Sequence, residues 1–141
     1  MKKFTLSTEK LMSFYRSELR DMCKACPFYG RFYSCPPVNI DLLKTLALHE
    51  TSYVIIEYAQ SLEQRKSIQL KMDSELKSSY NTVFSAGKCP KCERCLREIG
   101  KPCSDYLYSA ETLNLDMFAL YEYLTGEKLQ SDTFFLMYIV Q

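Results

Sequence analysis

Histidine occurs only once in this chain of 141 residues, as His49, and glycine only four times. The sequence accordingly has no Ser-His-Asp arrangement and no glycine-rich phosphate-binding loop. It also lacks a pair of carboxylates at a spacing typical of acid–base catalysis. If the chain is an enzyme, we therefore expect a bound metal to perform the chemistry.

Long apolar runs and an excess of charge of one sign are missing as well. No run approaches the roughly 18 residues of a membrane span, and the formal net charge is only +1. We therefore expect neither a membrane nor a nucleic acid as a partner. The first residues, Met1-Lys2-Lys3-Phe4, precede polar residues and do not form a secretory signal. These features favour a cytoplasmic protein, in which thiols stay reduced.

What the chain does contain is seven cysteines in two short segments. Every one of the five prolines touches one of these segments and bends the backbone there, which allows several thiolates to converge on one point. An odd number of cysteines does not suit a disulfide framework, so metal binding is the expected role. The first segment contains Cys23, Cys26 and Cys35, and the second contains Cys89, Cys92, Cys95 and Cys103.

The second segment predicts a metal centre with four thiolate ligands. Three of its cysteines form two successive C-x-x-C steps and the fourth follows, a pattern typical of proteins with a [4Fe-4S] cluster. A four-thiolate zinc site, which more often has two separated C-x-x-C pairs, is the alternative. Five basic residues near the cysteines would offset the negative charge of the thiolates: Lys88, Lys91, Arg94, Arg97 and Lys101.

Thiol exchange is a competing interpretation of the same segment. Cys89-Pro90-Lys91-Cys92 resembles the redox motif of glutaredoxin-like proteins, in which the pKa of one thiol is lowered. That chemistry needs two cysteines and would leave Cys95 and Cys103 without a use. We therefore favour a metal.

The first segment offers three ligands rather than four. Three protein ligands leave one coordination position open, as in metal sites that react with a substrate. Alternatively, a distant side chain such as His49, or a cysteine of the second segment, completes the site. We expect this second centre to lie close to the first, because both loops leave the ends of the same small sheet.

The apolar spacing predicts helices over residues 7–22, 40–48, 62–80 and 113–124, the second capped by Asn39 or Asp41. β-Branched and aromatic runs predict strands over residues 53–58, 82–84 and 133–140. The expected fold is α+β, or a small α/β fold, in one metal-binding domain spanning residues 1–141. It would have a sheet of about three strands flanked by helices, with two cysteine-rich metal-binding loops near one end.

Residues 26–37 read CPFYGRFYSCPP, residues 87–95 read GKCPKCERC, and residues 109–117 read SAETLNLDM. They resemble the segments C-P-x-Y-G-x4-C-P-P, G-x-C-x2-C-x2-C and S-x-E-A-x-G-I-D-V of a microbial family of predicted metal-binding proteins (domain of unknown function 2284). The resemblance implies that all seven cysteines are ligands, but it supplies no reaction. Asn114 replaces a family glycine, and a left-handed turn is expected there, with Asp116 capping the next helix.

Together, these patterns predict a metal-binding protein that carries an iron–sulfur centre, a [4Fe-4S] cluster. The expected role is electron transfer or an accessory redox function, with a redox protein as partner. A zinc-binding interaction module is one alternative. An enzyme that works at an open three-cysteine metal site is the other.

Overall fold

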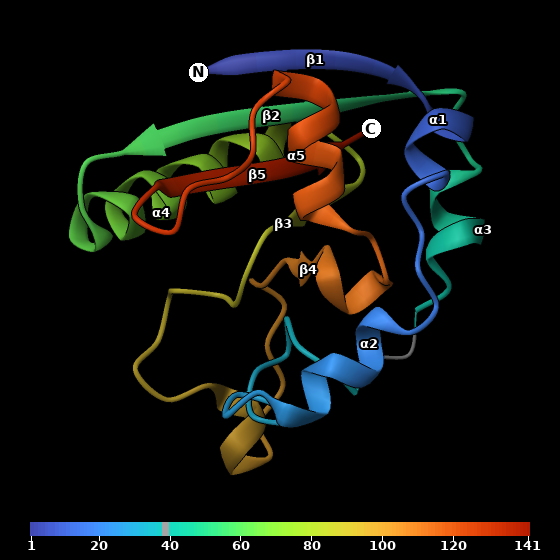
Figure 1. Ribbon diagram of the computed structural model, residues 1–141. Helices are drawn as coiled ribbons and strands as arrows, with labels where there is room; N and C mark the ends of the chain where they lie inside the picture. Colours follow the sequence, from blue (N-terminus) through green and yellow to red (C-terminus); the bar gives the residue numbers. More distant parts are fainter. Residues whose placement is uncertain (38–39) are drawn as a thin grey trace.

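The computed structural model describes residues 1–37 and 40–141 as an α+β fold built on a five-stranded mixed sheet (Figure 1). The strand order is β1-β2-β5-β3-β4, and all neighbours are antiparallel except β3 and β4. The expected sheet of about three strands is therefore wrong. The five strands are β1 (Lys2–Ser7), β2 (Thr51–Ala59), β3 (Val83–Ser85), β4 (Tyr108–Ser109) and β5 (Phe134–Val140).

The two strands that the sequence did not predict are the outer ones. In β1, half-buried Phe4 and Leu6 alternate with exposed residues, which is the period-two pattern of an edge strand. It was missed because residues 7–22 were assigned to a helix that begins directly after it. β4 has only two residues, Tyr108 and Ser109, and pairs in parallel with β3, so its own sequence carries almost no strand signal.

The predicted long helix is confirmed as α4 (Leu62–Ser79), which covers one face of the sheet. The Ser61 hydroxyl accepts a hydrogen bond from the Gln64 N–H and caps its first turn. Residues four apart along this helix pack on inward-facing residues of β2 and β5. This set includes Ile55, Ile68, Met72, Leu76, Leu136 and Tyr138.

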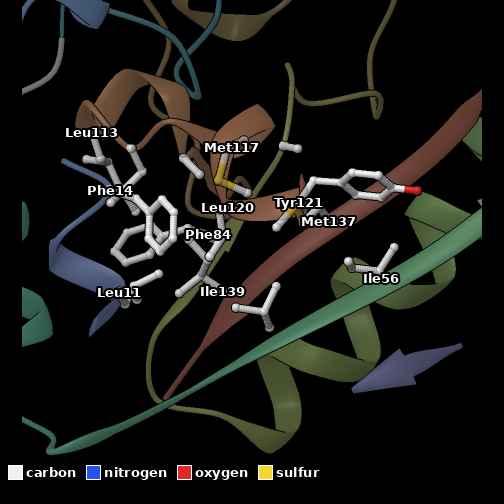
Figure 2. Packing of buried hydrophobic residues seen from close by; sticks show 14 of the residues in the cluster. Leu11, Phe14, Ile56, Phe84, Leu113, Met117, Leu120, Tyr121, Met137 and Ile139 are labelled. Atoms are coloured by element: carbon white, nitrogen blue, oxygen red, sulfur yellow. The ribbon is translucent and has the colours of Figure 1, made fainter. Parts of the chain in front are cut away.

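The opposite face carries the larger core, which α1 (Thr8–Met12) and α5 (Met117–Thr125) cover (Figure 2). The helix predicted over residues 113–124 begins later than expected, because a turn of 3-10 helix, η3 (Glu111–Leu113), precedes it. Asn114 is left-handed (φ 63°), and the Asp116 carboxylate accepts from the Ala119 N–H, as predicted. Gly126 (φ 74°) ends the helix in the left-handed conformation.

The helix predicted over residues 7–22 is wrong as one continuous element. It divides into α1 and α2 (Leu19–Met22), which runs on into the 3-10 turn η1 (Cys23–Ala25). Between them the backbone pairs with the chain before α5: the Asp116 N–H donates to Phe14 O and the Arg16 N–H donates to Asn114 O. These tertiary hydrogen bonds replace those that a continuous helix would form.

The remaining helix is α3 (Leu42–Leu46), within the predicted range 40–48. Asp41 caps it, since its carboxylate accepts from the Lys44 N–H at 3.2 Å. The alternative cap, Asn39, lies outside the described residues. No helix in residues 1–37 and 40–141 is long and apolar enough to cross a membrane.

Both cysteine segments lie together beyond the β3–β4 edge of the sheet (Figure 1). The second segment leaves the sheet after β3 and returns to it at β4, and between them it forms only the 3-10 turn η2 (Leu96–Ile99). We call residues 23–37 and 88–106 the cysteine lobe.

Candidate metal centre

The seven cysteines are free thiols, and they divide between two cavities. Cys89, Cys92, Cys95 and Cys103 line one cavity, which we call the four-thiol cavity. Cys23, Cys26 and Cys35 line the other, the three-thiol cavity. The division matches the two segments of the sequence, so no cysteine of one segment lines the cavity of the other.

The four-thiol cavity has a volume of about 160 Å³ and mostly apolar walls. Phe32, Leu96 and the stacked pair Tyr33–Tyr106, whose ring centroids are 5.2 Å apart, contribute these walls. Lys91 and Asp105 also line it, and the Lys91 ammonium pairs with the Asp105 carboxylate at 2.6 Å. Apolar walls limit the access of water to whatever the thiols bind.

The three-thiol cavity is larger, at about 340 Å³, and its walls are also mostly apolar. Lys88, Ser109, Glu111 and Thr112 contribute side chains that can carry charge or form hydrogen bonds. Phe28, Tyr29 and Pro36 form its apolar part. The two cavities therefore differ in thiol count and in size.

An aromatic pair separates the cavities. Phe32 lines the four-thiol cavity and Phe28 lines the three-thiol cavity, and their rings meet edge to face with centroids 5.5 Å apart. The Lys88 ammonium lies over both rings, 4.6 Å and 4.7 Å from their centroids. The two cavities are thus neighbours.

Hydrogen bonds between the two segments fix this arrangement. The Arg97 guanidinium donates to the backbone carbonyls of Phe32, Cys35 and Pro37 at 3.0, 3.0 and 2.7 Å. The Cys89 N–H donates to the Ser34 hydroxyl at 2.9 Å, and Ser34 is fully buried. Because one planar guanidinium serves three carbonyls, the turn after Cys35 is held directly against the second segment.

Of the five basic residues expected around the second segment, only two line a cysteine cavity. Lys91 lines the four-thiol cavity and Lys88 the three-thiol cavity. Arg97 serves the carbonyls described above, and Arg94 forms an ion pair with Glu98 at 3.3 Å. Charge compensation at the thiols therefore depends on fewer side chains than the sequence suggested.

Burial raises the pKa of Cys23, Cys35 and Cys89 above the usual value of a thiol. At Cys23 the pKa is raised further by the neighbouring charges of Cys26 and Glu111. Burial thus favours the neutral, protonated form of these three thiols. For Cys89 the direction is opposite to the lowered pKa that thiol exchange requires, which weakens that interpretation.

Within residues 1–37 and 40–141, no three His, Cys, Asp or Glu side chains converge closely enough to hold a single metal ion. In a tetrahedral zinc site, with Zn–S bonds of about 2.3 Å, the sulfurs would be about 3.8 Å apart. Among the described residues, each set of thiols lines one cavity without closing into such a group.

His49 does not take part in either cavity. It follows α3, and its backbone carbonyl accepts a hydrogen bond from the Thr8 hydroxyl at 2.6 Å. The structure thus gives no support to His49 as a borrowed ligand. A carboxylate that does line the three-thiol cavity is that of Glu111, which the sequence reasoning did not identify as a donor. Its position in the S-x-E stretch of the resembled family was the available signal.

The comparisons with known proteins add no family: no family model matches the chain, and neither curated proteins nor solved structures gave a match.

Proposed function

We propose that the chain is an iron–sulfur protein with two neighbouring centres and an electron-transfer or accessory redox role. The observation that carries this proposal is the division of all seven cysteines between two adjacent cavities. If the cysteines were unrelated structural residues, we would not expect their thiols to line two cavities in sets that match the two sequence segments. The resemblance to the predicted metal-binding family supports the same conclusion.

The four-thiol cavity suits a [4Fe-4S] cluster held by Cys89, Cys92, Cys95 and Cys103. Four thiolates satisfy all four irons of such a cluster, so this centre has no open position and serves electron transfer better than catalysis. The chain's own contribution is the enclosure: Phe32, Tyr33 and Tyr106 exclude water, and Lys91 places a positive charge beside the thiolates. These are the features through which a protein adjusts a cluster's reduction potential.

The position of the Phe28–Phe32 pair supports electron exchange between the two centres, because one ring lines each cavity and the ring centroids are 5.5 Å apart. Cys26 and Cys92 are exposed at the surface of the cysteine lobe. A redox protein that docks on this surface would come close to both centres. The reducing cytoplasm is the compartment that suits seven free thiols.

The test is metal and sulfide analysis of the full chain purified without air, together with its Cys92→Ser variant. We expect iron and acid-labile sulfide in the wild type. The Cys92→Ser variant should lose the four-thiol centre, because serine is a poor ligand for iron–sulfur clusters. Ser104→Ala, which removes an exposed hydroxyl beside Cys103, is the matched control and should retain full iron.

Zinc without iron in anaerobically expressed protein would overturn the proposal and favour the zinc-binding interaction module instead. Iron content that is identical in wild type and Cys92→Ser would refute the assignment of the four-thiol centre. Zinc in protein purified in air is not the relevant measurement, since zinc readily occupies emptied thiolate sites.

A further inference from the structure

The three-thiol cavity contains one carboxylate, that of Glu111. The other described residues that line it include three thiols, one ammonium and the hydroxyls of Tyr29, Ser109 and Thr112, but no imidazole and no second carboxylate. The Lys88 ammonium lies over two aromatic rings and has no lone pair to offer a metal. The Thr112 hydroxyl donates to Ser34 O at 3.3 Å. Glu111 is therefore the strongest additional donor in this cavity.

The Glu111 side chain is anchored through only one of its two oxygens. Oε2 accepts from the Ser109 hydroxyl at 2.6 Å and from the Gly87 N–H at 3.2 Å. Oε1 receives no hydrogen bond from any residue in the described part of the chain. Anchoring one carboxylate oxygen while leaving the other available is how outer-shell partners orient a metal-binding carboxylate.

The local backbone explains why Glu111 is placed here. β4 ends at Ser109, the Ala110 N–H donates to Ser85 O at 2.7 Å, and η3 begins at Glu111. The Ser109 N–H also donates to Ser34 O at 2.9 Å, which joins this turn to the first cysteine segment. The carboxylate thus comes from the sheet, whereas the three thiols come from the lobe.

We infer that Glu111 is the fourth donor of the three-thiol centre, an oxygen ligand beside the thiolates of Cys23, Cys26 and Cys35. The inference rests on the proposed iron–sulfur function and specifies one of its two centres. Carboxylate oxygen is a harder ligand than thiolate and binds cluster iron more weakly. The position that it occupies is therefore exchangeable.

The ligand class follows from the same chemistry. A small, soft donor such as cyanide or a thiol binds iron of this kind better than a carboxylate does. The cavity of about 340 Å³ has room for such a molecule, and the Lys88 ammonium would favour an anion. The three-thiol centre is thus the place where this protein would bind a small thiol or similar anion.

Glu111→Gln tests the inference, because it keeps the side chain's size but removes the anionic donor. The matched control is Glu93→Gln, the same change at a carboxylate in the second segment that lines neither cysteine cavity. In full chain prepared without air, we expect Glu111→Gln to release one iron per chain to a chelator roughly 10–100-fold faster than wild type. The cyanide concentration needed to change the visible spectrum should also be lower for Glu111→Gln than for the wild type.

Ser109→Ala provides a second variant if Glu111→Gln fails to fold. It leaves the carboxylate in place but removes its anchor, so cyanide should bind more tightly than to the wild type, though less tightly than to Glu111→Gln. Iron release and cyanide affinity that match wild type in Glu111→Gln, or cyanide affinity unchanged in Ser109→Ala, would overturn the inference. Wild type without iron would instead refute the proposed function itself, so the two failures are distinguishable.

Discussion

The sheet with its helices and the cysteine lobe bury very different amounts of apolar side chain. Both faces of the sheet carry continuous clusters of buried residues, whereas the lobe contributes only two buried apolar side chains, Phe32, which is 4% exposed, and Pro36. The lobe has no strand, and its only regular elements are the short turns η1 and η2. Apolar burial can therefore account for the stability of the sheet but not for that of the lobe.

Polar interactions or a bound metal must therefore stabilise the lobe. Arg97, Ser34 and Tyr33 form hydrogen bonds that link its two segments, Tyr33 through its hydroxyl to Lys101 O at 2.7 Å. Each such bond contributes only about 1 kcal/mol net. Metal binding to a small cysteine site contributes far more, and much of that energy is folding energy. We therefore expect the lobe and the sheet to lose their structure independently of each other.

The largest expected effect is that of metal removal. On the proposed iron–sulfur function, removing the metal from the wild type should cost the lobe on the order of 10 kcal/mol of stabilisation. Amides of residues 23–37 and 88–106 should then exchange with solvent rapidly, whereas those of β2 and β5 remain protected. Hydrogen exchange before and after chelation measures this difference. If the amides of the lobe stay protected from exchange after chelation, polar contacts alone are enough to stabilise the lobe. The contrast between the lobe and the sheet would then be wrong.

A cavity in the sheet core should have the next largest effect, and in the opposite region. Ile139 is fully buried between Val54 and Phe84 of the neighbouring strands, so Ile139→Ala should lower the free energy of unfolding by about 2–5 kcal/mol. Ile99→Ala makes the same change in the lobe, where the side chain is 44% exposed, and should cost less than about 1 kcal/mol. Denaturant titration compares the two variants. Equal costs would contradict the contrast between the regions.

The same contrast explains how much of the molecule could be predicted from sequence. β2, β5 and α4 were predicted correctly because long apolar patterns determine them locally. The break between α1 and α2 could not be predicted, since it depends on two hydrogen bonds with distant residues, from the Asp116 N–H to Phe14 O and from the Arg16 N–H to Asn114 O. β4 was missed because two residues carry no periodicity.

For the candidate site, the sequence predicted the donors better than their surroundings. The seven cysteines and their two sets follow from spacing, and the structure gathers each set around its own cavity. Glu111 and Ser34 were not identified, because their roles arise only when residues far apart in the chain fold together. His49 was considered only because it is the sole histidine, and residue type alone does not predict position.

A smaller effect is expected from Arg97, which links the two halves of the lobe. Arg97→Lys keeps the charge but cannot reach three carbonyls with one planar group, so local opening of the lobe should become easier by about 1–3 kcal/mol. Arg94→Lys is the control, since Arg94 is exposed and pairs only with Glu98. Native-state hydrogen exchange of residues 32–37 provides the measurement. Similar exchange in the two variants would show that the guanidinium does not hold the lobe together.

The smallest expected effect lies where the two regions meet, at Asp73 of α4. This carboxylate is 2% exposed and accepts a hydrogen bond from the Tyr138 hydroxyl of β5 at 2.7 Å. Burial raises the pKa of Asp73, while the Tyr138 hydrogen bond and the positive charge of Lys91 in the lobe act to lower it. Lys77 lowers this pKa as well, whereas the Asp105 carboxylate raises it.

Because the folded protein binds this proton more tightly than the unfolded chain does, the contribution of Asp73 to stability is greatest below its ordinary pKa. That contribution is lost as the pH rises through the raised value. Asp73→Asn does not titrate, so its free energy of unfolding relative to wild type should increase between about pH 4 and pH 7, by about 1.4 kcal/mol for each tenfold difference in proton affinity. Denaturant titrations of both proteins across this range, at equal metal content, measure the change. If the free energies of unfolding of the two proteins change in parallel with pH, Lys91 fully compensates the buried charge of Asp73. The lobe, which contains Lys91, would then stabilise the sheet electrostatically.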